Sequence, residues 1–324
     1  MLKGALKNNA EWTQQEKELL KSIFDSSTYK QMSEILNRSE SAVRHTANKL
    51  GLKKSNAAIN PYMKYQYDRN FFSCIETEIQ AYWLGFIAAD GNVYKQKERK
   101  NHDGGLSSYL SIELSIKDID HLKLFNKSID GNIPVKTRIR NISFGERDAK
   151  ESETCFIRLF SNQIVQDLIL LEIVPDKTHV HKNLPIFSNE ILNIAFLRGY
   201  YDGNGSFYIQ QKTKDKSSGV FTISSPNKIY LESWRSRLYE LYDISSYITE
   251  EKPNDNTTIP CYKLGFKGLV NTYKFGEMLY KDSIIYLPRK FNSYNRYLYE
   301  NNIEERINRI LNYKDKLKSL KLPL

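Results

Sequence analysis

Cysteine, long apolar runs and an apolar N-terminal segment are all scarce in this sequence of 324 residues. Its 3 cysteines, Cys74, Cys155 and Cys261, lie far apart, so they support neither a disulfide framework nor a zinc site of the CxxC type. No apolar run approaches the roughly 18 residues that cross a bilayer, and residues 1–5 lack the core of a signal peptide. We therefore expect a cytoplasmic protein of a bacterial or phage-infected cell, or an organellar one, in a reducing compartment and outside the membrane.

Positive charge, by contrast, is abundant. The chain has 48 Lys and Arg against 38 Asp and Glu, a net charge of +10 and an isoelectric point near 9.2. A charged fraction of 27% with 12% aromatic residues is typical of a folded chain. The basic surplus favours a polyanionic partner, most often nucleic acid, but charge does not tell what happens to that polymer.

The N-terminal segment predicts a small three-helix module. Thr13 and Glu16 form a capping box that opens the first helix, and residues 29–36 form the second. Ser39 caps the third, which stops before Gly51. The tight turn before the third helix is typical of a helix-turn-helix, and the stretch resembles Myb/SANT-like domains; a three-helix protein-interaction module is the alternative. The DNA-facing residues expected here are Arg38, Ser41, Arg44, His45, Asn48 and Lys49.

The most informative feature is an internal repeat, because residues 81–91 and 195–205 align without a gap. In each copy a small residue recurs at every fourth position, which forms a smooth stripe along one face of a helix. Glycine costs a helix interior up to about 1 kcal/mol relative to alanine, and close contact with another helix would explain its presence. Each helix is therefore predicted to pack against the other. The stripe residues are Ala81, Gly85, Ala89, Ala195, Gly199 and Gly203.

Packing through these stripes would bring together Asp90 and Asn204, which lie near the ends of the two helices. Polar oxygens near a pseudo-two-fold axis of a basic protein suggest a divalent metal held against phosphate. Residues 83–91 and 197–205 resemble the two motifs of the single-chain LAGLIDADG homing endonucleases. Flanks similar to those of the family lie at residues 68–72, 174–178 and 285–290. The alternative is two core helices that end by chance in Asp-Gly and Asn-Gly caps.

Alternating polar and apolar residues follow each motif and predict short antiparallel strands. In residues 109–117, for example, Leu110, Ile112 and Leu114 share one face and polar residues share the other. The resemblance implies that two such sheets form a saddle whose polar side follows the major groove and reads base edges; an ordinary solvated sheet face is the alternative. The side chains expected to face DNA are Asn92, Tyr94, Gln96, Ser111, Glu113, Ser115, Lys117, Lys136, Arg138 and Arg140 in the first half, and Ser206, Tyr208, Gln210, Lys212, Thr222 and Ser224 in the second.

The resemblance also implies an activity and a catalytic site. Family enzymes hydrolyse one phosphodiester bond in each DNA strand across the minor groove, with metal held by the acidic residue at the eighth motif position and a basic residue from each half. By position, Asp90 carries over as the first metal ligand, and Lys177 and Lys290 are the candidates for the basic pair; a phosphate anchor or a surface charge is the alternative for each lysine. The expected metal site is Asp90 and Asn204 with Ala89 and Gly203. Mg²⁺ is the expected ion, with Mn²⁺ tolerated.

The second motif departs from the family at its eighth position, which is Asn204 where Asp is usual. An amide oxygen can bind a metal but brings no charge, so affinity for Mg²⁺ in that half should fall. The chain would then cut both strands, nick one strand preferentially, or bind DNA without cutting; a substitution made to prevent cleavage would look the same. Asp202 lies about 200° around the helix from Asn204, so we expect it to point away from the seam and to have a structural role.

Together these features predict an α+β protein with two pseudo-symmetric αββαββα-type repeats that form a DNA-binding saddle. The expected parts are a helix-turn-helix domain at residues 1–54, a linker at 55–76, the repeats at 77–187 and 188–300, and a basic C-terminal helix or tail at 301–324. The expected function is a monomeric, site-specific, Mg²⁺-dependent endonuclease of double-stranded DNA, free-standing or intron-encoded, because the terminal residues of an intein are missing. The rival is a non-cleaving DNA-binding regulator or an intron splicing cofactor on the same scaffold.

Overall fold

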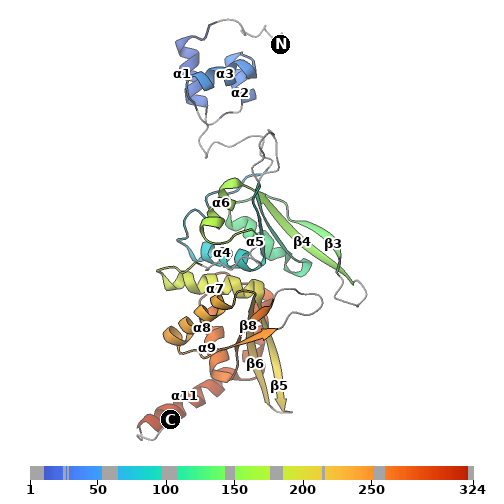
Figure 1. Ribbon diagram of the computed structural model, residues 1–324, viewed down its shortest axis with the longest axis vertical. Coiled ribbons are helices and arrows are strands. Elements are labelled where there is room, and N and C mark those ends of the chain that lie inside the picture. The colour runs from blue at the N-terminus through green and yellow to red at the C-terminus, as the bar shows by residue number, and fades with distance from the viewer. Residues whose placement is uncertain are drawn as a thin grey trace. The chain divides into compact units, whose positions relative to one another are not determined.

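The computed structural model describes residues 11–24, 27, 29–52, 65–96, 108–142, 150–175, 185–213, 216–251 and 260–319 (Figure 1). The chain divides into two compact units, Met1–Gln66 and Tyr67–Leu324. Among the described helices, none combines the length and the apolarity that a bilayer-spanning helix needs.

The N-terminal unit contains three short helices, α1 (Gln14–Ile23), α2 (Tyr29–Leu36) and α3 (Glu40–Lys49). At the start of α1, the backbone N–H of Glu16 donates to Oγ1 of Thr13 at 3.1 Å, and the carboxylate of Glu16 accepts the backbone N–H of Thr13 at 2.9 Å. The side chain of Ser39 caps α3, and Gly51 follows it with φ of +67°, a left-handed conformation that glycine adopts without strain. The three predicted helices and their caps are thus confirmed.

The second unit contains two copies of one α-β-β-α-β-β-α order of elements, followed by two helices. The first copy comprises α4 (Glu78–Asp90), β1 (Gly91–Tyr94), β2 (Tyr109–Ser115), the 3-10 turn η1 (Ile116–Asp118), α5 (Ile119–Ser128), β3 (Lys136–Ile142), β4 (Lys150–Phe160) and α6 (Asn162–Leu170). The second comprises α7 (Glu190–Asn204), β5 (Gly205–Thr213), β6 (Lys216–Ser225), α8 (Lys228–Tyr242), β7 (Tyr247–Glu251), β8 (Cys261–Phe266) and α9 (Leu269–Tyr280). The last two helices are α10 (Pro288–Glu300) and α11 (Ile303–Ser319). The predicted α+β architecture of two pseudo-symmetric repeats is confirmed.

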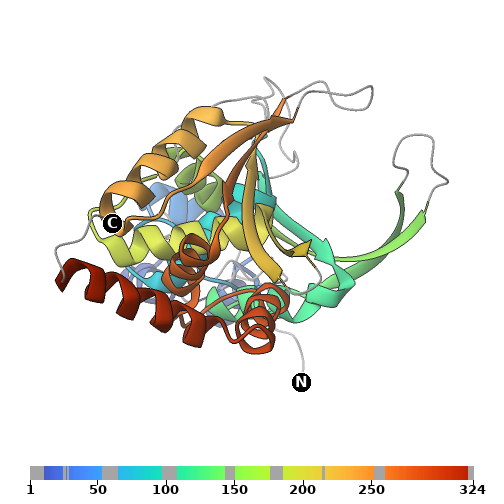
Figure 2. The ribbon, with the colours of Figure 1, turned by 90° about the horizontal axis from the view of Figure 1, so that it is seen from below.

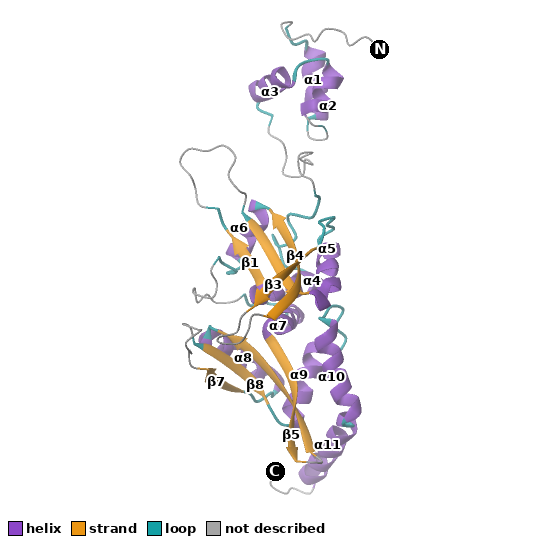
Figure 3. Cartoon of the chain, turned by 90° about the vertical axis from the view of Figure 1, so that its right-hand side faces the viewer, coloured by secondary structure: helices purple, strands orange, loops and turns teal. Residues whose placement is uncertain are grey.

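Each copy forms one antiparallel four-stranded sheet, with strand orders β1-β2-β4-β3 and β5-β6-β8-β7. The registers correspond, because Gly91 pairs with Ile112 in the first sheet and Gly205 pairs with Ile223 in the second. Helices α5 and α6 pack on the first sheet, and α8, α9 and α10 pack on the second (Figures 2 and 3). The apolar sheet residues buried beneath the helices include Leu110, Ile112, Ile157, Phe221, Ile223 and Leu264. The other face of each sheet carries the alternating polar residues.

Helices α4 and α7 pack against each other along their small residues. In its middle, α4 buries eight successive residues, so this part of the helix has no solvent-facing side. A β-carbon built on Gly85 would lie 2.8 Å from the carbonyl carbon of Phe196, and one built on Gly199 would lie 2.8 Å from the backbone nitrogen of Phe86. Real β-carbons essentially never approach backbone this closely, so the two glycines are what allow the helices to touch.

The second unit begins earlier than the predicted linker at residues 55–76 allows. The hydroxyl of Tyr67 donates to the backbone carbonyl of Phe160 at 2.8 Å, and the backbone N–H of Asp68 donates to the carbonyl of Ile129 at 2.7 Å. Tyr67 and Asp68 are therefore fixed to the first repeat. The polar composition of this segment predicted a linker. The hydrogen bonds have partners far along the chain, and local composition does not predict such contacts.

Candidate nucleic-acid interface and metal site

The ends of α4 and α7 lie side by side. Asp90 is the last residue of α4 and is exposed, and Asn204 is the last residue of α7 and is half-buried. A β-carbon built on Gly203 would lie 3.4 Å from Cγ of Asp90 and would collide with the methyl group of Ala89. The carboxylate of Asp90 therefore lies against the backbone of the second motif, and a strand of each sheet leaves directly from each helix end.

Asn204 has partners within its own repeat. Its side chain hydrogen-bonds to Tyr200, one turn earlier in α7, and the hydroxyl of Tyr200 donates to Oγ of Ser225 on β6 at 3.1 Å. Burial raises the pKa of Tyr200, and its hydrogen bonds with Ser225 and Asn204 offset only part of that rise, so the phenol stays protonated. The side chain of Asn204 is thus held by Tyr200, which is itself bonded to the adjoining sheet.

Lys290 on α10 is buried, with 7% of its surface exposed. Its ammonium donates to the backbone carbonyls of Tyr201 at 2.8 Å, Gly203 at 3.3 Å and Gly205 at 2.6 Å. A positive charge is stabilised at this negative end of a helix dipole. Burial lowers the pKa of Lys290 to about 8, against the opposing effect of the Asp202 charge. The residue predicted to lie beside a phosphate therefore binds the carboxyl end of α7.

Asp202 is fully buried beneath the same helix end. Its carboxylate accepts hydrogen bonds from the hydroxyl of Tyr82 at 2.8 Å, the hydroxyl of Tyr280 at 3.0 Å and the backbone N–H of Leu287 at 2.7 Å. Burial raises the pKa of Asp202 to about 6, although the charge of Lys290 and these hydrogen bonds lower it. The role is structural, but the expectation that Asp202 points away from the seam was wrong, because Tyr82 belongs to α4.

The oxygen atoms at the end of α4 suit a hard divalent cation better than those at the end of α7. Asp90 supplies a carboxylate, and Ala89 supplies a backbone carbonyl, which are the oxygen ligands that Mg²⁺ prefers. In the other half, the carbonyl of Gly203 already accepts from Lys290, and Asn204 brings no charge. Within the described residues, no group of three His, Cys, Asp or Glu side chains could hold a metal. The residues therefore fit a cation bound chiefly through Asp90.

Most sheet residues predicted to face DNA are accessible. Those that are exposed are Asn92, Tyr94, Ser115, Lys117, Lys136, Arg138, Arg140, Ser206, Tyr208 and Gln210, and those that are half-buried are Gln96, Glu113, Thr222 and Ser224. Ser111 differs, because it is buried and donates its hydroxyl to the carbonyl of Ile157 at 3.3 Å. Lys177 and the side chain of Lys212 lie outside the described residues.

In the N-terminal unit, one predicted contact is placed differently from the others. Ser41, Arg44, His45, Asn48 and Lys49 are all exposed on α3. Arg38, however, is 1% exposed: its guanidinium donates to the carboxylate of Glu16 at 2.9 Å and lies over the ring of Trp12, 5.0 Å from its centroid. Arg38 therefore joins the start of α1 to the turn before α3 and is not available to DNA.

The open face of the first sheet also carries Arg158, which was not among the residues predicted to face DNA. Arg158 lies on β4 opposite Ser111, is exposed, and has its guanidinium 4.6 Å from the centroid of the Tyr109 ring. In the sequence, Cys155, Ile157 and Leu159 stand at every second position, and this spacing predicts a strand with Arg158 on its opposite face.

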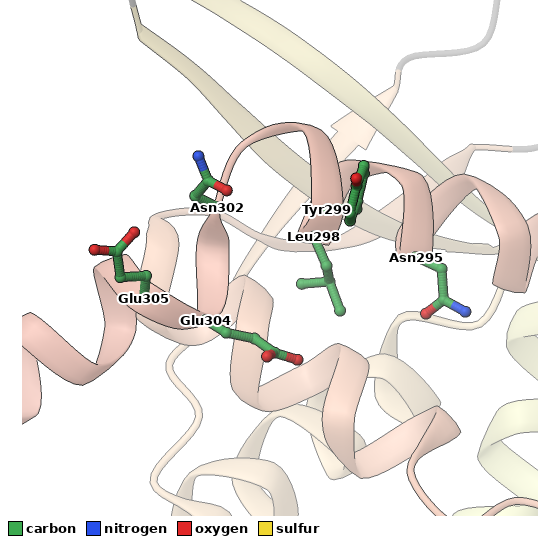
Figure 4. A pocket seen from close by; sticks show the side chains of 6 residues that line it. All are labelled: Asn295, Leu298, Tyr299, Asn302, Glu304 and Glu305. Atoms are coloured by element: carbon green, nitrogen blue, oxygen red, sulfur yellow. The ribbon is translucent and has the colours of Figure 1, made fainter.

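A shallow pocket of about 380 Å³ lies at the turn between α10 and α11 (Figure 4). It is lined by Asn295, Leu298, Tyr299, Asn302, Glu304 and Glu305. The two carboxylates disfavour a polyanion, and the pocket contains none of the predicted site residues. Its position gives it no part in the site at the ends of α4 and α7.

The sequence and the fold were compared with those of known proteins. No curated protein matches the sequence. Solved structures with low identity include the meganuclease I-SmaMI bound to uncleavable DNA (17% identity over 70% of this chain and 90% of that chain, TM-score 0.48) and the LAGLIDADG homing endonuclease I-GzeII in complex with its DNA target (12%, 74% and 96%, TM-score 0.46). Residues 192–287, which run from α7 through α9, match the family model of the LAGLIDADG-like domain. The match lies in the second repeat of this chain, and the first repeat has the same order of elements and strands.

Proposed function

We propose that the protein is a sequence-specific DNA endonuclease of the homing type, which hydrolyses phosphodiester bonds of double-stranded DNA as a monomer. The observation that carries this proposal is the position of Asp90. Its carboxylate lies against Gly203 where the two repeats meet, and β1 and β5 start directly from the two helix ends. A phosphate that lay across the two open sheet faces would therefore pass this carboxylate.

The residues of the site would have different roles in catalysis and in DNA binding. A bound divalent ion, Mg²⁺ or Mn²⁺, would supply positive charge at the phosphate and make water a better nucleophile at neutral pH. Asp90 and the carbonyl of Ala89 would hold it. Lys290 fixes the carbonyls at the end of α7, so Gly203 and Asn204 keep their positions relative to Asp90. The arginines and lysines of the first sheet would neutralise backbone phosphates and hold the duplex.

The exposed face of α3 would extend the recognised site. Its Ser41, Arg44, His45, Asn48 and Lys49 form one accessible polar surface, as a recognition helix in a major groove requires.

Plasmid cleavage tests the proposal directly. The full chain is incubated with supercoiled plasmid that carries the insertion-free form of the host locus, in Mg²⁺ and separately in EDTA. Nicked or linear product that is cut at one position, and that forms in Mg²⁺ but not in EDTA, supports the proposed endonuclease activity. Tight and specific binding without either product would contradict it.

Binding without cleavage is the second candidate function, and a specific observation favours it. The second half of the site lacks a carboxylate, and the carbonyl of Gly203 is already bonded to Lys290. Such a half-site would hold a cation weakly, which suits a DNA-binding regulator or an intron splicing cofactor. The plasmid experiment separates the two candidates.

Restoring an acidic residue at position 204 should strengthen metal binding in the second half of the site. We expect Asn204→Asp to raise the ratio of linear to nicked plasmid by about tenfold, because a carboxylate adds the charge that a hard cation prefers. The ratio is measured over time on an agarose gel at fixed Mg²⁺.

Asn92→Asp is the matched control, since it makes the same change at an exposed position of β1. It should weaken DNA binding through charge repulsion and leave the ratio of linear to nicked product unchanged. An unchanged ratio in Asn204→Asp as well would show that Asn204 does not limit the second cut.

A further inference from the structure

On the open face of the first sheet, a single carboxylate holds two arginines. Glu113 on β2 accepts hydrogen bonds from Nε of Arg138 at 2.9 Å and also from its Nη2, and from Nη2 of Arg140 at 2.5 Å. The hydroxyl of Thr154 donates to the same carboxylate at 2.7 Å. The ring of Phe156 lies beneath the Arg138 guanidinium, 4.9 Å from its centroid. We call these five residues the Glu113 cluster.

The cluster is partly shielded but still open to a ligand. The side chain of Glu113 is 22% exposed, whereas those of Arg138 and Arg140 are 39% and 48% exposed. Burial by itself would raise the pKa of Glu113, but the hydrogen bonds from Arg138 and Thr154 outweigh it and lower the pKa. The carboxylate is therefore ionised at neutral pH, and it lies deeper in the sheet surface than the two guanidinium groups that it holds.

The way in which Glu113 binds Arg138 leaves a usable edge of the guanidinium. The carboxylate engages the Nε–Nη2 edge, and Nη1 donates no hydrogen bond to any of the described residues. The Nη1–Nη2 end therefore keeps N–H donors that point along two parallel directions. This end matches the O6 and N7 acceptors of guanine in the major groove, which arginine binds with two hydrogen bonds.

The second sheet has a different set of charges at the corresponding positions. The registers place Ser224 where the first sheet has Glu113, and Glu251 where it has Arg138. Glu251 forms an ion pair with Lys263, which takes the position of Phe156. Among the described strands, the paired arginine donors therefore occur in the first sheet.

The geometry points to Glu113 as a positioning residue that orients Arg138 and Arg140 to read guanine in one half of the DNA site. This inference rests on the proposed function as a DNA-binding protein. A long arginine side chain loses rotamer freedom when it binds, and a partner that holds it beforehand removes part of that entropic cost. Glu113 also repels phosphate, so the cluster favours base edges over non-specific contact with the DNA backbone.

Selection from a pool of randomised DNA duplexes, with the full chain and EDTA present, tests this role. The bound sequences of the unmodified protein should contain guanine at one or two positions. Arg138→Lys should reduce the guanine preference at one of them by about tenfold or more, because a lysine cannot form the two-pronged contact. Glu113→Gln should reduce it by about three- to tenfold, while binding to non-specific duplex stays equal or rises, since a negative charge is removed.

Glu251→Gln on the second sheet is the matched control and should leave those positions unchanged. Glu113→Asp, which keeps the charge, should recover part of the preference, and thermal unfolding should show each variant folded. An unchanged guanine preference in a folded Glu113→Gln variant, or a selected site whose responsive positions are not guanine, would overturn the role of Glu113. Selection of no sequence by the unmodified protein would instead overturn the proposed function.

Discussion

Replacing Asp90 with asparagine should abolish plasmid cleavage and leave DNA binding intact. At the described ends of α4 and α7, Asp90 is the one exposed side chain that carries a negative charge. It lies against the backbone of the second motif. The substitution would leave only two amide side chains, at positions 90 and 204, to hold a divalent ion, and neither brings charge. We expect the rate of product formation to fall by about 10³-fold or more, the usual scale for loss of a main electrostatic contribution.

The same substitution at Asp120, an exposed acid on α5, provides a control of matched charge. Asp120→Asn should cleave at the unmodified rate, and both variants should bind a duplex of the cleaved sequence with similar or slightly higher affinity. Unfolding should also be followed with and without Mg²⁺. We expect Mg²⁺ to stabilise the unmodified chain more than the Asp90→Asn variant, because binding to the folded state alone stabilises it. Full cleavage by Asp90→Asn would exclude Asp90 as the main ligand.

Gly199→Ala should be among the most destabilising single substitutions in the second unit. Alanine is intrinsically better than glycine in a helix by about 1 kcal/mol, so propensity alone predicts a gain. The added methyl group, however, would lie 2.8 Å from the backbone nitrogen of Phe86 and 2.9 Å from the carbonyl carbon of Tyr82. Backbone cannot move aside as a flexible side chain can, so the overpacking cost dominates and we expect a loss of about 3 kcal/mol or more.

Chemical denaturation of the full chain, followed by tryptophan fluorescence, measures this loss, which corresponds to a fall in melting temperature of roughly 6–12 °C. Gly51→Ala is the control, because a β-carbon there would meet no atom within 4 Å, although its φ of +67° makes alanine strained. We expect that change to cost about 1 kcal/mol and to leave the unfolding of the second unit unaltered. A neutral or stabilising Gly199→Ala would show that α4 and α7 are more loosely packed than the structure has them.

The structural features that could be predicted from the sequence are those that depend on neighbouring residues along the chain. The capping box at Thr13, the cap at Ser39 and the terminating glycine at Gly51 are all local, and all were predicted. The repeat itself was visible because two helices that pack face to face carry the same four-residue spacing of small side chains. The alternation in β2 likewise predicted which of its residues are buried, apart from Ser111.

The residues whose placement differed are those whose partners come from distant elements. Arg38 was expected to face DNA because a basic residue beside a recognition helix usually does. Its guanidinium instead forms an ion pair with Glu16, which lies 22 positions earlier. Lys290 was expected beside a phosphate, but the packing of α10 brings it to the carbonyls of Tyr201 and Gly205. No periodicity or composition encodes such a contact, since it depends on how whole helices pack.

The burial of α4 also sets an order for folding. The helix ends at Asp90, whereas α7, which covers its small-residue face, begins only at Glu190. The first repeat cannot complete its core until the second has been synthesised, and contacts so distant in sequence are slow to form. A nascent or truncated chain that stopped before α7 would expose a continuous apolar helix surface, and such surface promotes aggregation. The two repeats are therefore one cooperative folding unit, despite the near independence of their sheets.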